Sequence, residues 1–409
     1  MSDLGAGSLP AESHALELAR GDLRRRQAEW GVRAGSAPQA SPLAAALDCA
    51  KRREADCVQD GQYIRDNVFR YPADAERARQ TLTRQIIERV NPGPFEDPVF
   101  LEMLARQAAS VELALHPSDD RKAAIDPAVL SRILVGTIGE PRSEAYSAAI
   151  GDAAVIAMSA GMMEFYYQCA KAVVLAWKPL PPAGSNLLSF SSAPGDTEES
   201  LDNDPSPVAL LRDTLAAWLY DGRPRSPHSV LPPQERQTPI TMLINGAERF
   251  VLAHEYGHVL MHKLRVFGQD AAAAPGADSA WDMEFEADTF GALMAVQSGG
   301  MLDLLPANMA LESAELAMRA EEIFDDVLAL ATGNAPEETA SHPPFPQRVA
   351  VLEHIYRQHH PDPAAADDDL VGMQVPARTL DQIWRRARPQ LTTIIQSGIP
   401  LNAVWGKSS

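Results

Sequence analysis

Hydrophobic residues recur at spacings of three and four along much of this chain, which is the period of an amphipathic helix. The first such runs lie at 75–90 and 99–115, and proline-containing sequences follow both of them. One earlier helix is expected near 11–30. The remaining predicted helices cover 160–177, 208–220, 280–298, 306–332, 345–358 and 377–395.

A shorter apolar pattern predicts three β-strands, over 133–138, 145–150 and 153–158. Gly151-Asp152 separates the second strand from the third, and such a dipeptide is typical of a tight hairpin turn. The chain is therefore expected to place a small sheet between helical segments.

The longest helical pattern begins at Thr238-Pro239, where Thr would cap the helix and Pro would occupy its first position. One continuous stripe then steps by four and three residues. Its members are Ile240, Ile244, Ala247, Val251, His254 and His258. Two histidines thus belong to a face that is otherwise apolar, where an imidazole without a partner would be costly.

Three segments lack such periodicity. Residues 1–42 are rich in Ala, Gly, Ser and Pro, and they are expected to form a partly disordered lead-in. Residues 178–207 combine prolines, serines and an acidic string, which predicts an exposed insertion. Residues 223–237 predict a Pro-rich loop.

Composition and charge disfavour two classes of function, nucleic-acid binding and membrane association. The chain has 409 residues, with 36 Lys and Arg against 55 Asp and Glu, so its formal net charge is −19. An acidic surface disfavours nucleic acid and anionic membranes as partners. The apolar stretch 147–177 contains Asp152, Glu164 and Lys171, which favours buried core over a membrane span. The three cysteines form no disulfide framework, and with no recognisable secretory signal they predict a cytoplasmic protein.

The sequence His254-Glu255-Tyr256-Gly257-His258 has the HExxH spacing of a zinc site. On a helix, residues i and i+4 share one face, so both imidazoles can bind one Zn²⁺. Glu255 lies about 100° around the helix from His254. It is poorly placed as a ligand there but can act as general base on a zinc-bound water. The alternative is a surface helix with two unrelated histidines.

A catalytic zinc site needs a third protein ligand, and the sequence offers two candidates. His262 continues the series, but each four-residue step rotates by about 40° on an ideal helix, so three imidazoles would fan apart. Glu284 and Asp288 lie one turn apart on a later predicted helix. Glu284 is the preferred third ligand, and Asp288 could accept the spare N–H of His254. In an acidic protein, the alternative for this pair is a solvated helix face.

These segments resemble the gluzincin metallopeptidases, most closely those of the M48 type, and they are also similar to the ImmA/IrrE-like and Lit-like cytosolic bacterial peptidases. The matching sequences are HEYGHVLMH at 254–262, EFEADTFG at 284–291 and SHPPFPQRV at 341–349. A weaker similarity covers AYSAAIGDAAVIAMSAGMM at 145–163. The resemblance extends over about residues 127–360.

The resemblance assigns a role to each motif residue. The metal ligands would be His254, His258 and Glu284, the general base Glu255, and the residue that orients a ligand Asp288. The resemblance also implies that His342 stabilises the oxyanion or blocks the site in a resting state. A solvated histidine in a Pro-rich turn is the alternative for His342. Arg348 would form an ion pair that holds this turn.

We therefore expect an α+β, mostly helical fold, with a zincin-like core that contains a small β-sheet and the HExxH helix. The expected organisation has four parts. They are a lead-in at 1–42, a helical N-terminal region at 43–126, the metallopeptidase core at 127–360 with its insertion at 178–207, and a C-terminal helical extension at 361–409.

The expected function is that of a soluble, cytoplasmic, zinc-dependent endopeptidase. An extended protein or peptide substrate would add to strand 153–158, interpreted as the edge strand beside the metal helix. Neither nucleic acid nor a membrane is expected as a partner, and the sequence does not indicate an oligomeric state. Two alternatives stay open: a catalytically silent metal-binding module that holds a protein partner, and a zinc hydrolase that acts on a non-peptide amide. The intact Glu255 favours an enzyme.

Overall fold

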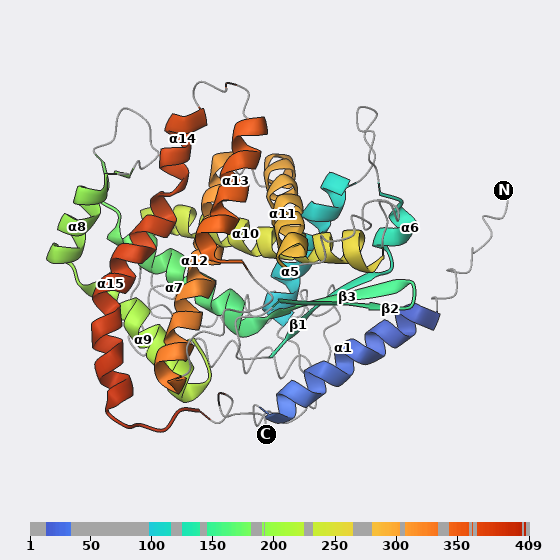
Figure 1. Ribbon diagram of the computed structural model, residues 1–409, viewed down its shortest axis with the longest axis horizontal. Helices are drawn as coiled ribbons and strands as arrows, with labels where there is room; N and C mark the ends of the chain where they lie inside the picture. Colours follow the sequence, from blue (N-terminus) through green and yellow to red (C-terminus); the bar gives the residue numbers. More distant parts are fainter. Residues whose placement is uncertain are drawn as a thin grey trace, which may run out of the picture.

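The computed structural model describes residues 14–33, 98–115, 125–139, 145–180, 190–191, 193–224, 232–264, 280–302, 307–333, 343–359, 362, 366–402 and 405. Within them the protein is mostly helical and has one small three-stranded sheet, which confirms an α+β fold (Figure 1). The first elements are α1 (His14–Arg33), α5 (Pro98–Leu115), α6 (Pro127–Leu130), β1 (Ile133–Ile138), β2 (Ala145–Ile150), β3 (Ala153–Ser159) and α7 (Ala160–Ala176). Then follow α8 (Pro194–Asn203), α9 (Ser206–Asp221), α10 (Gln234–Gly257), the π-helix η1 (His258–Lys263), α11 (Ala280–Leu302), α12 (Ala307–Thr332), α13 (Phe345–His359), α14 (Ala366–Met373) and α15 (Val375–Gln396).

The sheet has the strand order β1-β3-β2. β1 runs parallel to β3, and β2 runs antiparallel to it across the predicted hairpin, in which Gly151 takes a positive φ of 64°. The prediction that 153–158 forms the edge strand is wrong, because β3 is the central strand and every one of its residues is buried. An unbroken apolar run is typical of a strand covered on both faces, whereas β2 is half-buried. β2 is the outer strand that contacts α10 and η1.

Helices cover both faces of the sheet. On one face, α1 packs Ala19 and Leu23 against Ala153, Val155 and Ala157 of β3 (Figure 1). The intervening residues of β3 point to the opposite face and join the main hydrophobic core. The period of two along β3 therefore divides the protein into a small cluster under α1 and a large cluster under the other helices.

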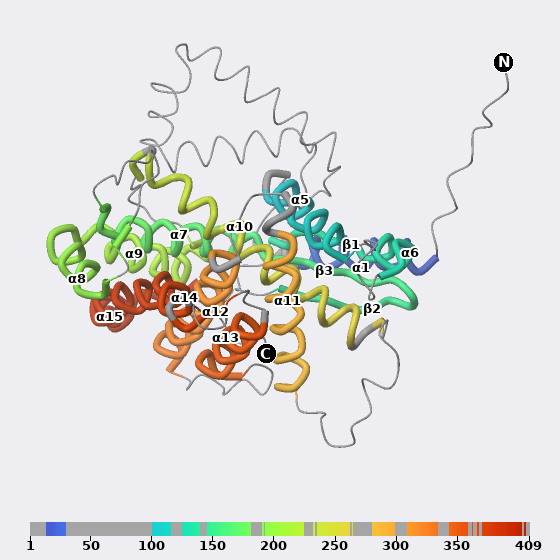
Figure 2. The backbone as a smooth tube through the Cα atoms, turned by 90° about the horizontal axis from the view of Figure 1, so that it is seen from above, coloured from blue at the N-terminus to red at the C-terminus, as the bar shows by residue number. Residues whose placement is uncertain are grey.

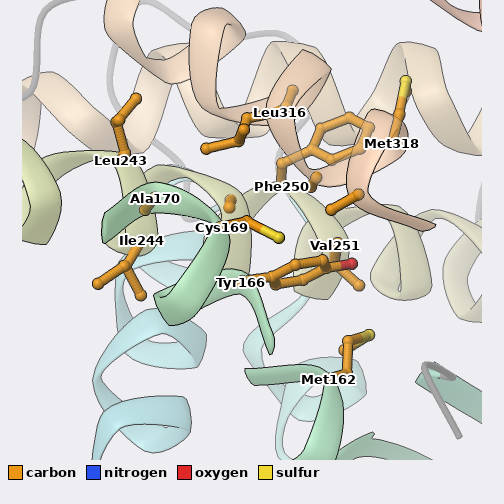
Figure 3. Packing of buried hydrophobic residues seen from close by; sticks show 14 of the residues in the cluster. Met162, Tyr166, Cys169, Ala170, Leu243, Ile244, Phe250, Val251, Leu316 and Met318 are labelled. Atoms are coloured by element: carbon orange, nitrogen blue, oxygen red, sulfur yellow. The ribbon is translucent and has the colours of Figure 1, made fainter. Parts of the chain in front are cut away.

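The main core lies where α7, α10 and α12 meet. Figure 3 shows Tyr166 and Cys169 of α7 facing Phe250 of α10, with Leu316 of α12 beyond them. Figure 2 shows the sheet at one end of the molecule and α8, α9 and α15 at the other. The helix α10 runs between these ends and connects the two regions (Figure 1).

The helix α10 begins earlier than its capping pattern predicts. It starts at Gln234, so Pro239 lies inside the helix and Thr238 does not cap it. The physical reason is a tertiary contact, since the Arg236 guanidinium donates to the carbonyl of Leu175 at 2.8 Å. The last carbonyls of a helix such as α7 lack intrahelical partners, and Arg236 supplies one. The predicted apolar stripe is confirmed, because its members through His254 are all buried.

The segment 178–207 is not exposed throughout. Part of it forms α8, whose Thr197 and Leu201 are buried. Arg386 of α15 pairs with Asp202 at 2.7 Å on the outside of this contact. The prediction of an exposed insertion is therefore wrong for α8, because two side chains spaced by four anchor an otherwise acidic helix.

The C-terminal helix α15 contributes Leu380, Ile383 and Leu391 to the main core, and α5 contributes Leu104 and Val111. The predicted domain boundaries remain predictions, but α5 before 127–360 and α14 and α15 after it share one hydrophobic cluster with that region. The helix α14 was not predicted. The predicted helix at 75–90 lies outside the described residues, as does most of the 1–42 segment apart from α1. Among the described helices, none is both long and apolar enough to cross a membrane.

Candidate metal centre

The junction of α10 and η1 brings two histidines onto one face. The Nε2 atoms of His254 and His258 lie 3.1 Å apart, and their rings stand almost perpendicular with centroids 4.7 Å apart. His254 is buried and His258 is half-buried. The predicted i, i+4 geometry therefore directs both imidazoles to the same point.

The helix α11 brings a carboxylate to that point. Glu284 places Oε2 3.3 Å from His254 Nε2 and Oε1 3.3 Å from His258 Nε2. Among the residues that the structure describes, these three side chains form the group whose ligand atoms lie close enough to hold one metal ion, all within 4.8 Å of one another. The sequence separation between α10 and α11 does not impose this convergence, so it depends on how the two helices pack.

Two glycines allow that packing. A Cβ atom added to Gly257 would lie 3.2 Å from the Ala287 Cα, and one added to Gly291 would lie 3.2 Å from the His254 backbone nitrogen. Both distances are tighter than ordinary carbon contacts. The backbones of α10 and α11 thus approach each other beside the ligands, and sequence reasoning had given no role to either glycine.

Asp288 lies one turn after Glu284 and orients His254 from the other side of the ring. Its Oδ1 lies 2.9 Å from His254 Nδ1, and the carboxylate is completely buried. Burial alone would raise the pKa of Asp288, but hydrogen bonds from Arg348 and His254 hold that pKa below its ordinary value. The carboxylate therefore stays ionised and accepts from Nδ1, which leaves Nε2 directed at Glu284.

Arg348 is the partner that keeps this carboxylate charged. Its Nε donates to Asp288 Oδ2 at 2.9 Å and its Nη2 donates to Oδ1 at 2.7 Å. The resemblance implies that Arg348 forms an ion pair that holds its turn, and the structure shows that its partner is Asp288 on α11. The SHPPFPQRV segment indicates that Arg348 matters, but its neighbours in the sequence do not identify Asp288 as the partner.

The donor set suits a cation. With Nδ1 of His254 bonded to Asp288, two imidazole nitrogens and a carboxylate face one another at 3.1 to 3.3 Å. Burial lowers the pKa of His254, but the Asp288 and Glu284 carboxylates outweigh burial and raise it to about 10. The site thus favours a positive charge, either a proton or a metal ion. A tetrahedral ion with bonds of about 2.0–2.1 Å holds its ligand atoms about 3.3 Å apart, and the 3.1 Å between the two Nε2 atoms is close to that spacing.

Of the remaining predicted site residues, the structure describes the side chain of Glu255 but not those of His342 and His262. Glu255 is buried on α10 next to His254. His342 lies outside the described residues, and so does the side chain of His262. The backbone of His262 belongs to η1, in which Leu264 N donates to Val259 O at 2.7 Å. The ideal-helix argument against His262 assumed continuous α-helix there, so its exclusion as a ligand stays a prediction. Short π-helical turns are common at functional sites.

No protein-family model matches this chain, and no curated protein or solved structure does either. The resemblance to the gluzincins therefore rests on its motif segments, and membership of that family stays a proposal.

Proposed function

We propose that this chain is a zinc-dependent endopeptidase with a zincin-like core, and that His254, His258 and Glu284 hold the metal. The observation that supports this most directly is that the two imidazole Nε2 atoms lie 3.1 Å apart and that each lies 3.3 Å from one carboxylate oxygen of Glu284. Two imidazoles and one carboxylate form a ligand set that catalytic zinc uses while keeping a position open for water. Zinc bound there would lower the pKa of that water and polarise the carbonyl to be cleaved.

The protein's own residues then have separate tasks. Glu255 accepts the proton of the attacking water on its carboxylate and later delivers it to the leaving amine. Its burial keeps the carboxylate in a region of low dielectric, where charge interactions are strong. Asp288 holds the His254 ring in one orientation through Nδ1.

The outer strand β2 is the surface on which we propose that an extended peptide binds. In an antiparallel hairpin closed by a two-residue turn, the pair next to the turn is hydrogen-bonded and bonded pairs then alternate. Ile150 pairs with Ala153 in this register, so the backbone groups of Ala149 and Ala145 point away from β3. β2 also contacts η1, which begins at His258. A strand added there would pass close to the metal centre.

Glu255→Gln tests the proposed reaction. Cleavage of an unfolded protein substrate in the presence of zinc should fall by about 100- to 10,000-fold, because the amide cannot accept the proton. Zinc content, measured by plasma mass spectrometry, should equal that of the parent. Glu286→Gln is the matched control, since this exposed carboxylate lies on α11 between the proposed ligand and Asp288.

Equal cleavage by Glu255→Gln and the parent would refute the mechanism. A parent chain that binds zinc and a protein partner without any turnover would instead support the silent binding module. Hydrolysis of small amides without cleavage of proteins would support the third possibility, an amide hydrolase.

A further inference from the structure

Arg348 donates two parallel hydrogen bonds to Asp288, the residue that orients the proposed ligand His254. Both side chains are buried, and together the two bonds fix the plane of the carboxylate. Oδ1 of Asp288 accepts from Arg348 and also faces Nδ1 of His254. The orientation of the imidazole therefore depends on the carboxylate, and that of the carboxylate depends on the guanidinium.

The Arg348 guanidinium also contacts a second carboxylate, that of Glu321. Its Nη1 lies 3.7 Å from Oε2 of Glu321 on α12, and Oε1 of Glu321 accepts from the Tyr166 hydroxyl of α7. Tyr166 is buried in the main core, as Figure 3 shows, and its burial raises the pKa of the hydroxyl so that it remains a donor. A single chain of contacts thus links α7, α12, α13 and α11 to the histidine on α10.

We propose that Arg348, braced by Glu321 and Tyr166, is the positioning residue that aims Nε2 of His254 at the bound cation. This inference rests on the proposed function, because it assumes that the three ligands hold a metal. It assigns a role in metal binding to residues that are not themselves ligands. Residues that orient metal ligands typically change metal affinity by about 10- to 100-fold when replaced.

An arginine suits this role better than a lysine would. The planar guanidinium matches the two carboxylate oxygens, whereas an ammonium group is a point charge that leaves the carboxylate plane undetermined. A residue that served only to neutralise Asp288 would be replaceable by lysine. Arg348→Lys keeps the positive charge but loses the planar group, whereas Arg348→Met loses both. Comparing the two variants therefore separates the effect of charge from that of carboxylate orientation.

The test is a double-mutant cycle on the full-length chain, read by zinc affinity in competition with a chromophoric chelator. Arg348→Met should weaken zinc binding by about 10- to 100-fold. Asp288→Asn should do the same, and adding Arg348→Met to Asp288→Asn should cause little further loss, because Arg348 acts through Asp288. Arg357→Met is the control on the same helix, since Arg357 pairs with Asp367 on an exposed face, and it should leave affinity unchanged.

Cobalt provides a second readout that a purely stabilising residue would not alter. Co²⁺ bound in place of zinc has visible absorption bands that report its ligand geometry, and these bands should shift in Arg348→Met and remain in Arg357→Met. Arg348→Lys should keep the fold but bind zinc at least about threefold more weakly. Tyr166→Phe removes only one hydroxyl and should weaken zinc binding by a smaller factor.

The outcomes separate this inference from the proposed function. A parent chain that binds no zinc would overturn both. If the parent binds zinc and a folded Arg348→Met binds it within twofold, with unchanged cobalt bands, the positioning role is wrong and the metal site stands. If Arg348→Met does not fold, parent-like affinity in both Arg348→Lys and Tyr166→Phe would overturn the inference.

Discussion

At the level of single residues, the metal centre depends on two positions that carry no functional group. Gly257 lies between the two histidines, and Gly291 lies one turn after Asp288. A side chain at either position would meet the facing backbone, so only glycine lets α10 and α11 approach this closely. The distance from Glu284 to the histidines is therefore set partly by the absence of a side chain elsewhere.

Gly291→Ala tests that dependence. The new methyl group would lie 3.1 Å from Phe250 and 3.2 Å from the His254 backbone, so the helices must separate slightly. We expect a loss of about 1–3 kcal/mol in the free energy of unfolding, measured by urea denaturation, together with weaker zinc binding. Gly372→Ala, in the helix α14 with open space around it, should be neutral or slightly stabilising. Equal effects of the two substitutions would show that close packing is not the reason for Gly291.

At the level of secondary structure, α12 carries a carboxyl group in an unfavourable setting. Glu315 is buried, and burial raises its pKa to about 8, with further increases from Glu353 on α13 and Glu312 and a decrease from Arg378 on α15. In the unfolded chain this carboxyl would titrate near its ordinary value of 4.5. Between those two pH values the folded protein holds more protons than the unfolded chain, so Glu315 makes stability fall as the pH rises.

Glu315→Gln should remove this contribution, because an amide does not titrate. Relative to the parent, the variant should gain about 3–4 kcal/mol in the free energy of unfolding between pH 5 and pH 8.5, since each pKa unit corresponds to about 1.36 kcal/mol. Urea denaturation at both pH values measures the difference. Asp325→Asn, an exposed substitution on the same helix, should show no such gain. A pH-independent difference between Glu315→Gln and the parent would contradict the proposed titration.

At the level of the whole molecule, the proposed ligands connect helices that belong to one hydrophobic core. His254 lies in the last turn of α10, His258 is the first residue of η1, and Glu284 lies near the start of α11. The helices α10 and α11 pack against each other and against α5 and α12. A metal that binds this arrangement and not the unfolded chain must stabilise the fold by mass action.

Zinc should therefore raise the thermal unfolding temperature. At a free concentration of 100 times Kd, the stabilisation is about 2.7 kcal/mol, which should appear as a shift of a few degrees in a thermal scan. A chelator should reverse the shift, and Mg²⁺ should not produce it, because magnesium prefers oxygen ligands. His258→Ala should not respond to zinc. A similar zinc-induced shift in His258→Ala would place the binding elsewhere on the chain.

Local periodicity was enough to predict most of the described helices, the three strands and the spacing of the two histidines. These features depend on the geometry of a single segment, in which side chains four apart share a helix face whatever surrounds them. The same reasoning placed Glu284 and Asp288 one turn apart on a second helix. It could not give the distance between the two helices, which depends on Gly257 and Gly291 meeting a facing backbone.

Contacts between distant segments required the folded chain. The central position of β3, the early start of α10 and the docking of α8 each depend on a partner far away in sequence. Arg348 shows this dependence most clearly. Its charge predicts an ion pair, but the sequence contains many carboxylates that could be its partner. Burial selects Asp288, since an ionised carboxylate in the core is stable only with a partner that is also buried.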